Sequence, residues 1–172
     1  MAQVFLSLGA NLGDTKVALQ GAVEAIEKVA RLIKSSGFYE TEPWGNPDQL
    51  WFLNAVVEIE TDLEPLPLLH AIKEIEKKLG RKPRFESNAP REIDIDILFY
   101  DNLVFESDTL QIPHPHIADR LFTLTMLNEI APNFLHPILK KNIAILLNEC
   151  EDSSIVRPAN GHKSAKKTRD TV

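Results

Sequence analysis

The segment Arg91–Tyr100 alternates apolar side chains with carboxylates, and this alternation constrains the fold more than any other feature of the chain. Successive side chains of a β-strand point to opposite faces, so Asp94 and Asp96 lie next to each other on one face. The other face carries four apolar side chains, those of Ile93, Ile95, Ile97 and Phe99. The sequence therefore predicts a strand that packs one face in a core and presents two neighbouring carboxylates on the other.

Two carboxylates held side by side repel each other, and each loses hydration beside an apolar strand. A divalent cation between them removes both penalties. Mg2+ suits this position because it favours carboxylate oxygens, keeps several waters and completes its shell with substrate phosphates. Asp94 and Asp96 are therefore a candidate magnesium site. The alternative for so short a motif is the solvated outer face of an edge strand.

Length and composition limit the class of protein. A chain of 172 residues fits one domain with a real core. Its 19 basic and 25 acidic residues give a net charge of −6, which argues against a general nucleic-acid or membrane-surface binder. Cys150 is the only cysteine, so a disulfide framework and a cysteine-based zinc site are excluded. Without a transmembrane run or a signal peptide at Met1–Val4, we expect a soluble, cytoplasmic protein.

Hydrophobic periodicity predicts the element order β-α-β-β-α-β. Strands are expected at 4–8, within 31–39, at 52–61 and from 93 onward, with helices after Asp14 or Thr15 and at 65–79. This order is typical of an α+β fold with a ferredoxin-like core, in which a mostly antiparallel sheet carries its helices on one face.

A C-terminal hairpin and helices are appended to this core. The hairpin is expected at 103–112 and the helices at 117–130 and 139–148. We therefore expect a single domain over residues 1–150. Residues 151–172 form a polar, basic tail that we expect to be disordered.

A group of charged residues lies between the second predicted helix and the aspartate strand. Glu76 is followed by Arg81, Lys82, Arg84 and Arg91. Basic side chains next to a metal pair are what an anionic phosphoryl substrate needs, because they neutralise charge on the transferred group.

The segment Ile112–His116 holds two histidines between prolines and is followed by Arg120 and Phe122. The prolines make it stiff, and a rigidly held His114 can donate a hydrogen bond to a phosphate. A zinc site would need a further ligand that the spacing of the other histidines does not offer.

Aromatic and amide side chains gather in two further segments. Pro43 and Trp44 follow Thr41, and Asn54 comes two residues after Phe52. An asparagine amide can match the edge of a flat heterocycle while an aromatic ring stacks on its face. Taken alone, these residues are explained better by core packing of Phe52 and a turn at Pro43.

Taken in order, six segments resemble the 6-hydroxymethyl-7,8-dihydropterin pyrophosphokinase family of folate biosynthesis, and the resemblance covers about residues 2–147. They are Leu6–Gly13 (LSLGANLG), Phe38–Pro43 (FYETEP), Phe52–Ala55 (FLNA), Ala89–Leu98 (APREIDIDIL), Ile112–Pro115 (IPHP), and Arg120 with Phe122.

The resemblance implies transfer of pyrophosphate from ATP to the hydroxymethyl group of the dihydropterin, with release of AMP and with two Mg2+ ions. It implies metal binding by Asp94 and Asp96, which with Arg81 and Arg91 form the catalytic set. It implies nucleotide contacts at Glu76, Arg81, Arg91, Ile97, His114 and Arg120. It implies substrate contacts at Thr41, Pro43, Trp44, Phe52, Asn54 and Phe122, with Phe52 and Phe122 on either side of the pterin ring.

The chain departs from the family pattern in one loop. Where the family often carries an arginine and a tryptophan, this chain has Ser87 and Asn88, and we expect Arg84 or Phe85 to compensate. A catalytically impaired pterin- or nucleotide-binding relative therefore remains an alternative. An aspartate-nucleophile phosphatase is disfavoured because apolar residues follow the acid pair, and an RNA-binding sheet because it would expose aromatic residues. We expect a monomer that binds small molecules, with no obligate protein partner, no nucleic acid and no membrane.

Overall fold

The computed structural model describes residues 1–83, 86 and 88–159. Its main sheet has six strands in the order β5-β1-β4-β3-β8, with β2 also paired to β4, and every pairing is antiparallel. The strands are β1 (Ala2–Ala10), β2 (Arg31–Ser35), β3 (Tyr39–Thr41), β4 (Phe52–Thr61), β5 (Asp94–Tyr100) and β8 (Val156–Pro158). The helices are α1 (Thr15–Glu27), α2 (Pro65–Lys78), α3 (Leu121–Ile130) and α4 (Ile143–Glu149), and β6 (Phe105–Glu106) and β7 (Gln111–Ile112) form a separate hairpin.

The predicted ferredoxin-like order is confirmed, with one strand divided in two. The second predicted strand is split into β2 and β3, and both pair with β4. Ser36 lies in the break: its backbone N–H donates to Val56 O at 2.8 Å, and its hydroxyl oxygen accepts from Val56 N at 2.9 Å. The buried serine therefore keeps the chain attached to β4 where the regular ladder is interrupted.

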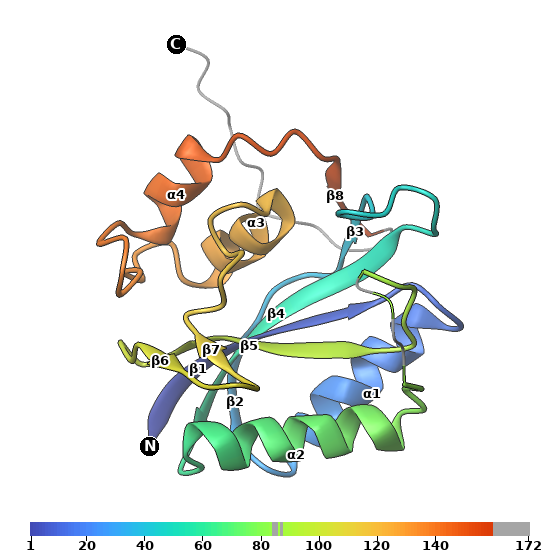
Figure 1. Cartoon of the computed structure of the whole chain (residues 1–172), viewed down its shortest axis with the longest axis horizontal. Helices are drawn as coiled ribbons and strands as arrows, with labels where there is room; N and C mark the ends of the chain where they lie inside the picture. The colour runs from blue at the N-terminus through green and yellow to red at the C-terminus, as the bar shows by residue number, and fades with distance from the viewer. Residues whose placement is uncertain (84–85, 87, 160–172) are drawn as a thin grey trace.

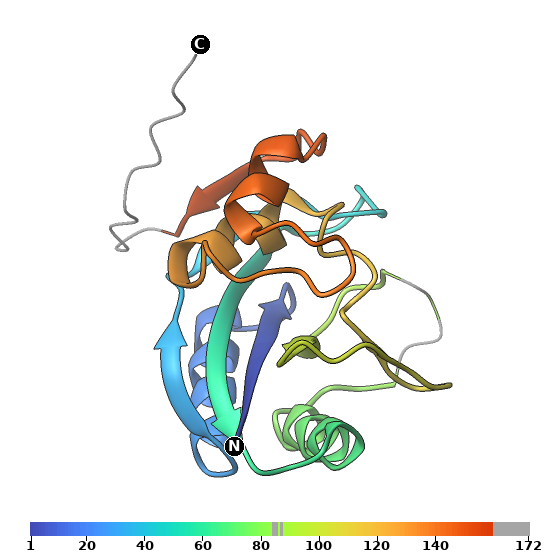
Figure 2. The ribbon, with the colours of Figure 1, turned by 90° about the vertical axis from the view of Figure 1, so that its left-hand side faces the viewer.

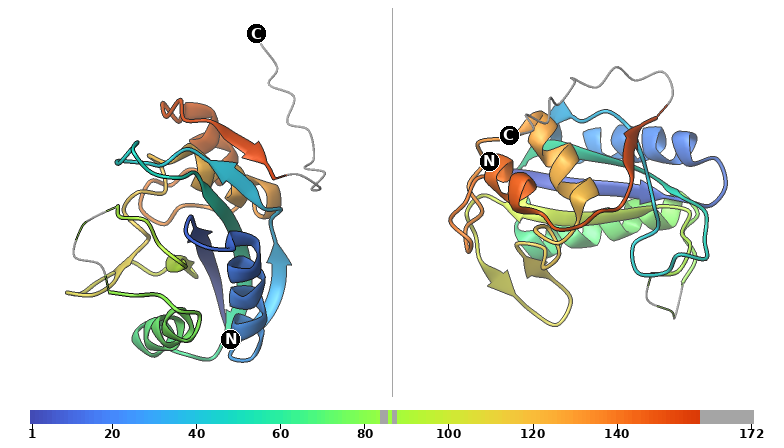
Figure 3. Two further views of the ribbon diagram at one scale, coloured as in Figure 1. Left: turned by 90° about the vertical axis from the view of Figure 1, so that its right-hand side faces the viewer. Right: turned by 90° about the horizontal axis from the view of Figure 1, so that it is seen from above.

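Two cores cover the two faces of the sheet (Figure 1). On one face α1 and α2 pack against alternate residues of β1, β4 and β5. Asp14 caps α1 by accepting from Val17 N at 3.1 Å, and Gly80 follows α2 with a φ of +92°, as expected of a helix-ending glycine. On the other face lie α3 and α4, which Figure 3 shows in front of the sheet when the molecule is seen from above.

The strand β5 does not keep one alternation over its whole length. Ile95 and Ile97 pack in the core on the α1 and α2 side, as predicted, but Phe99 belongs to the other core. The cause is a β-bulge: Leu6 pairs with Ile97, whereas the preceding residue Phe5 pairs with Phe99. Leu98 is thus an extra residue, and it moves every later side chain of β5 to the opposite face. The prediction that Phe99 shares a face with the isoleucines is wrong.

The C-terminal half also differs from the sequence expectation. The helix predicted from Ile117 begins only at Leu121, because the residues before it form the loop that carries His114. The tail predicted to be disordered from Glu151 is ordered through Ala159, and Val156–Pro158 add the edge strand β8 to β3, as Figure 2 shows in red beside the sheet. Residues 160–172 lie outside the described part of the chain.

The longest helix of the described residues, α2, has 14 residues, and none of the helices described is both long and apolar enough to cross a membrane.

A substitution at Phe99 tests its packing in the second core. Its side chain is fully buried and packs against the rings of Phe5 and Phe134, with centroids 6.1 and 4.7 Å away. We expect Phe99→Ala to lower the free energy of unfolding by about 3–5 kcal/mol in urea titrations. The exposed Leu66→Ala should change it by no more than about 0.5 kcal/mol. A loss below about 1 kcal/mol for Phe99→Ala would contradict burial of this ring in the second core.

Candidate active site

A cavity of about 390 Å3 lies between the α3 side of the sheet and the loop before α3. Most of the site residues predicted from the sequence line it: Thr41, Trp44, Phe52, Asn54, Arg91, Asp94, Asp96, His114, Arg120 and Phe122. A more open hollow of about 600 Å3 beside α4 shares Trp44 with the cavity but contains neither the acid pair nor the arginines. The smaller cavity is therefore the candidate site, and its volume suits a small organic ligand.

The floor of the cavity is the backbone of β1. Gly9 pairs with Asn54 of β4 on one side and with Asp94 of β5 on the other. A Cβ atom at Gly9 would lie 2.5 Å from the Oδ1 atom of Asn54, closer than real Cβ contacts allow. The glycine therefore leaves a flat strip of backbone between an acidic end and an amide end of the cavity.

At the acidic end, Asp94 is held by two arginines. Its Oδ1 accepts from Arg81 at 2.8 Å and its Oδ2 from Arg91 at 2.5 Å. Burial by itself would raise the pKa of Asp94, but the two guanidinium groups outweigh it and hold the pKa below its usual value. Asp94 is therefore ionised at neutral pH.

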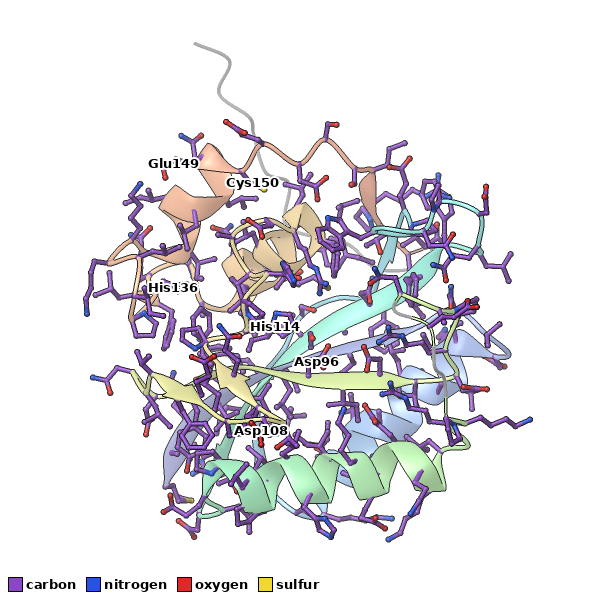
Figure 4. All side chains as sticks on the ribbon, in the orientation of Figure 1. Asp96, Asp108, His114, His136, Glu149 and Cys150 are labelled. Atoms are coloured by element: carbon purple, nitrogen blue, oxygen red, sulfur yellow. The ribbon has the colours of Figure 1, made fainter. Side chains whose placement is uncertain are left out.

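Asp96 has the opposite environment. No hydrogen bond from the described residues reaches its carboxylate. Burial, and then repulsion by Asp94, raise the pKa of Asp96 to about 7. Figure 4 shows Asp96 and His114 between the sheet and α3. The pair thus contains one carboxylate that two arginines hydrogen-bond and one that no described side chain hydrogen-bonds.

Glu76 holds the acidic end of the cavity in place through its contacts with β5 and Arg81. Its side chain is 3% exposed, and its Oε1 accepts from Ile95 N at 2.7 Å and lies 2.8 Å from Arg81. Arg81 therefore joins Glu76 of α2 to Asp94 of β5. Neither Glu76 nor Arg81 lines the cavity, so each acts through Asp94 in this structure. Lys73, which the sequence analysis did not include, reaches the same Glu76 oxygen at 3.1 Å.

The donor set fits a divalent cation of the Mg2+ type. Among the described residues no group of three or more His, Cys, Asp or Glu side chains could hold a metal, so the protein offers the two carboxylates alone. Mg2+ is commonly bound by one or two carboxylates with waters and substrate phosphates as its remaining ligands. Burial and then repulsion by Asp94 raise the pKa of Asp96, and a cation held between the two carboxylates would offset both effects.

His114 forms part of the opposite wall and is held in one orientation. Its backbone N–H donates to Leu98 O at 2.9 Å, and its Nδ1 accepts from His116 N at 3.1 Å. Burial, followed by repulsion from Arg120, lowers the pKa of His114 to about 4. The ring is therefore neutral at pH 7, and with Nδ1 accepting, Nε2 carries the proton and is the donor.

Arg120 lies beside this histidine with its guanidinium stacked on aromatic rings. It is 4.5 Å from the ring centroid of Trp44 and 5.9 Å from that of Phe122. Its buried Nε has no hydrogen-bond partner among the described residues. Burial lowers the pKa of Arg120, but the usual value is so high that the group stays charged. The cavity thus contains a cation with an unused donor.

At the amide end, Asn54 and Thr41 form one polar unit. The Nδ2 atom of Asn54 donates to Thr41 Oγ1 at 2.6 Å, and both residues are almost fully buried. The rings of Phe52 and Phe122 line the same cavity. This end therefore offers an amide edge and aromatic faces, which is what a flat heterocycle with polar edges requires.

Besides Glu76 and Arg81, two more predicted residues, Ile97 and Pro43, are not part of the cavity wall. Ile97 is 3% exposed and its side chain packs in the core on the α1 and α2 side, so the predicted nucleotide contact of this residue stays a prediction. Its neighbour Asp96 faces the cavity, and the strand pleat sends the two side chains to opposite faces. Pro43 also does not line the cavity, although Trp44 does.

Several lining residues were not found from the sequence, among them Ser7, Gly9, Gln49 and His116. A signal existed for three of them, because Ser7 and Gly9 lie in the first family-like segment and His116 in the Pro-His-Pro-His run. The proposed compensation by Arg84 or Phe85 lies outside the described residues.

A ferredoxin-like sheet whose cavity has an acid pair and Arg91 on one wall, and a histidine and Arg120 on the opposite wall, is typical of a phosphoryl-transfer class of enzyme. Residues 5–132 match the family described as 7,8-dihydro-6-hydroxymethylpterin-pyrophosphokinase (HPPK). The chain belongs to this family.

Known relatives agree with this assignment. A 2-amino-4-hydroxy-6-hydroxymethyldihydropteridine pyrophosphokinase of Aquifex aeolicus is 45% identical over 141 residues, which are 82% of this chain and 88% of that protein. The folic acid synthesis protein FOL1 of Dictyostelium discoideum is 42% identical over 136 residues, which are 79% of this chain and 20% of that one. The crystal structure of wild-type Plasmodium falciparum HPPK-DHPS has a TM-score of 0.66 at 20% identity and shares the fold; the match covers 87% of this chain and 43% of that one. The chain thus spans less than half of these two longer proteins.

The raised pKa of Asp96 predicts how stability depends on pH. The folded protein binds this proton more tightly than the unfolded chain does, so stability falls as the pH rises from about 4 to about 7. Asp96→Asn removes this loss, and in chelator its free energy of unfolding should exceed that of the parent by about 2 kcal/mol at pH 8 but not at pH 4.5.

Denaturant titrations at the two pH values make the comparison, with the exposed Asp108→Asn as the control that should follow the parent. Added Mg2+ should stabilise the parent at pH 8 and leave Asp96→Asn unchanged. Parallel pH curves for the parent and Asp96→Asn would refute the raised pKa.

Proposed function

We propose that this protein transfers the pyrophosphoryl group of ATP to the hydroxymethyl oxygen of 7,8-dihydro-6-hydroxymethylpterin, in folate biosynthesis. The observation that carries the proposal is the division of one cavity into an acid–arginine end and an amide–aromatic end. The gap between them is the backbone strip at Gly9. Such a cavity suits two substrates that meet in the middle, one polyanionic and one flat and polar.

At the acidic end the triphosphate lies against Asp94 and Asp96. Mg2+ bound there supplies neutralisation of the phosphate charge and alignment of its oxygens. Arg91 and Arg81 already bond Asp94, so they keep this carboxylate fixed and ionised, and Asp96 stays available to the cation. Asp96 has the weaker protein contacts and the higher pKa, and loses its proton when a cation binds.

His114 and Arg120 act on the phosphate oxygens from the opposite wall. Neutral His114 donates through Nε2, and Arg120 supplies a charged donor with an unused Nε. Two fixed donors stabilise charge on the transferred group without rearranging during the reaction.

At the amide end the pterin edge bonds to Asn54 and Thr41, and its faces stack on Phe52 and Phe122. This orientation directs the hydroxymethyl group toward the acidic end. The hydroxyl oxygen forms a bond to the β-phosphorus, the bond from the β-phosphorus to the α,β-bridging oxygen breaks, and AMP leaves with that oxygen. The hydroxyl proton passes to solvent. Holding the two substrates in line supplies most of the rate enhancement, and no protein nucleophile takes part.

The remaining expectations from the sequence stay predictions. They are a monomeric, cytoplasmic protein with two Mg2+ ions per ATP, no nucleic-acid or membrane partner and no obligate protein partner.

Product analysis tests the proposed reaction. With ATP, Mg2+ and 7,8-dihydro-6-hydroxymethylpterin, we expect AMP and the pterin diphosphate in equal amounts, measured by ion-exchange chromatography. Asp96→Ala should lose activity by at least about 1,000-fold while keeping its circular dichroism spectrum, because one of two metal carboxylates is gone. ADP as the product, or no turnover that depends on the pterin, would refute the proposal.

Gly9→Ala tests the amide end separately. The added methyl group must displace Asn54, because it would lie 2.5 Å from Oδ1. Loss of the Asn54 contact should weaken pterin binding by about 10–100-fold, with ATP-analogue binding changed far less. Calorimetric titration measures both affinities. The control is Gly21→Ala, which meets only the flexible Leu79 side chain at 3.3 Å. An unchanged pterin affinity in Gly9→Ala would contradict the role of this strip.

A further inference from the structure

The segment Asp152–Pro158 contacts three elements that form the amide–aromatic end of the cavity. It follows α4 and lies beyond residues 5–132, which match the family. Its contacts are with the start of α3, with β3 and the residue after it, and with the loop residue before β4. Each of these places carries or adjoins a residue that lines the cavity.

The first contact completes the N-terminus of α3. The helix begins after Arg120, whose side chain makes no capping hydrogen bond. The Oδ2 atom of Asp152 instead accepts from Leu121 N at 2.9 Å, from 31 residues away in sequence. Its Oδ1 is held by Ser154 N at 2.9 Å, which fixes the orientation of the carboxylate. Hydrogen bonds from Ser154 and Leu121 outweigh the effect of burial and keep the pKa of Asp152 below its usual value.

A carboxylate at this position stabilises a helix start, because it accepts from a free N–H and lies at the positive end of the helix dipole. The first turn of α3 carries Phe122, and Arg120 precedes it, and both line the cavity. Asp152 therefore fixes the turn that presents an aromatic ring and a guanidinium to the site.

The second contact is the β8–β3 pairing, in which Thr41 lies opposite Val156. It continues past the strand: Glu42 N donates to Ile155 O at 3.2 Å, and Ile155 N donates to Glu42 Oε2 at 3.0 Å. Thr41 and Glu42 line the cavity, so the outer edge of this wall is held by β8.

The third contact is made by Arg157. Its Nε donates to Glu40 Oε2 at 2.8 Å, and its guanidinium lies 4.6 Å from the ring centroid of Trp51. Trp51 directly precedes Phe52, which lines the cavity. The arginine thus links β3 to the start of β4 on the outside of the wall.

We propose that Asp152–Pro158 is a positioning segment that sets the shape of the pterin end of the cavity, with Asp152 and Arg157 as its positioning residues. The proposal rests on the proposed function, and it extends the site to a part of the chain beyond the matched family residues. The acidic end is fixed by a different set of contacts, from Glu76 through Arg81 to Asp94. Loss of the segment's contacts therefore lowers affinity for the flat heterocycle more than affinity for the nucleotide, because Arg120, the one phosphate-binding residue next to the segment, is also held by its stacking on Trp44.

The test measures two affinities in each variant by calorimetry. The probes are the ATP analogue with a methylene group in place of the α,β-bridging oxygen, with Mg2+, and then 7,8-dihydro-6-hydroxymethylpterin with that analogue saturating. Asp152→Ala should weaken pterin binding about fivefold, in proportion to the loss of a helix cap. Arg157→Ala should weaken it about threefold, in proportion to an exposed cation–π contact. The analogue's affinity should stay within about twofold of the parent value in both.

Matched controls separate positioning from general loss of stability. Glu151→Ala removes a neighbouring exposed charge, and Arg31→Ala removes an exposed Arg–Glu pair of the same kind, 3.3 Å long and distant from the cavity. Both should keep the parent's affinities. Asp152→Asn retains an acceptor oxygen and should bind the pterin more tightly than Asp152→Ala. In ligand-free Asp152→Ala, amide hydrogen exchange at residues 121–123 should accelerate.

The proposal is overturned if Asp152→Ala and Arg157→Ala both bind the pterin with the affinity of the parent protein. It is also overturned if the variants lose affinity for the pterin and for the ATP analogue by equal factors. Failure of the proposed function gives a different result, namely a parent protein that does not bind the pterin at all.

Discussion

Two carboxylates on one face of a buried strand form the constraint on which the rest of the site depends. The β5 pleat makes Asp94 and Asp96 neighbours, and neither burial nor their mutual repulsion allows both to ionise without help. The two carboxylates receive unequal stabilisation of their negative charge from the surrounding side chains. Asp94 receives both arginines and is ionised, whereas Asp96 receives no donor from the described residues and has a pKa of about 7. Environments that separate the pKa values of paired acids are typical of sites that perform chemistry.

The bulge at Leu98 connects this pair to the second half of the molecule. Before the bulge, β5 faces the core of α1 and α2 with its isoleucines and the cavity with its aspartates. After it, Phe99 turns to the core of α3 and α4. Leu98 O also accepts from His114 N, so the loop with the histidine is fixed opposite the acid pair. Because of this one inserted residue, β5 contributes side chains to both cores. The same residue also fixes the His114 loop, which forms the opposite wall of the cavity.

Much of this fold follows from local pattern. The bounds of β4 were predicted correctly and those of α2 to within one residue, because each has a regular period and clear breaking residues. The face of Phe99 was predicted wrongly, because a bulge depends on the partner strand and leaves no periodic signal. The start of α3 was placed four residues early, since apolar residues before it pack without being helical. The tail looked disordered by composition, yet β8 is held by the open edge of β3, which composition does not reveal.

The sequence by itself determined the order of elements, the common face of Asp94 and Asp96 and the ordered segments that identify the family. These depend on the strand period, on hydrophobic spacing and on residues read along the chain. Only the tertiary structure decided which charges meet: Arg81 with Asp94 across 13 residues, Asp152 with Leu121 across 31 and Arg157 with Glu40 across 117. Hydrogen bonds and ion pairs act over a few ångströms of space, and separation along the chain does not report that distance.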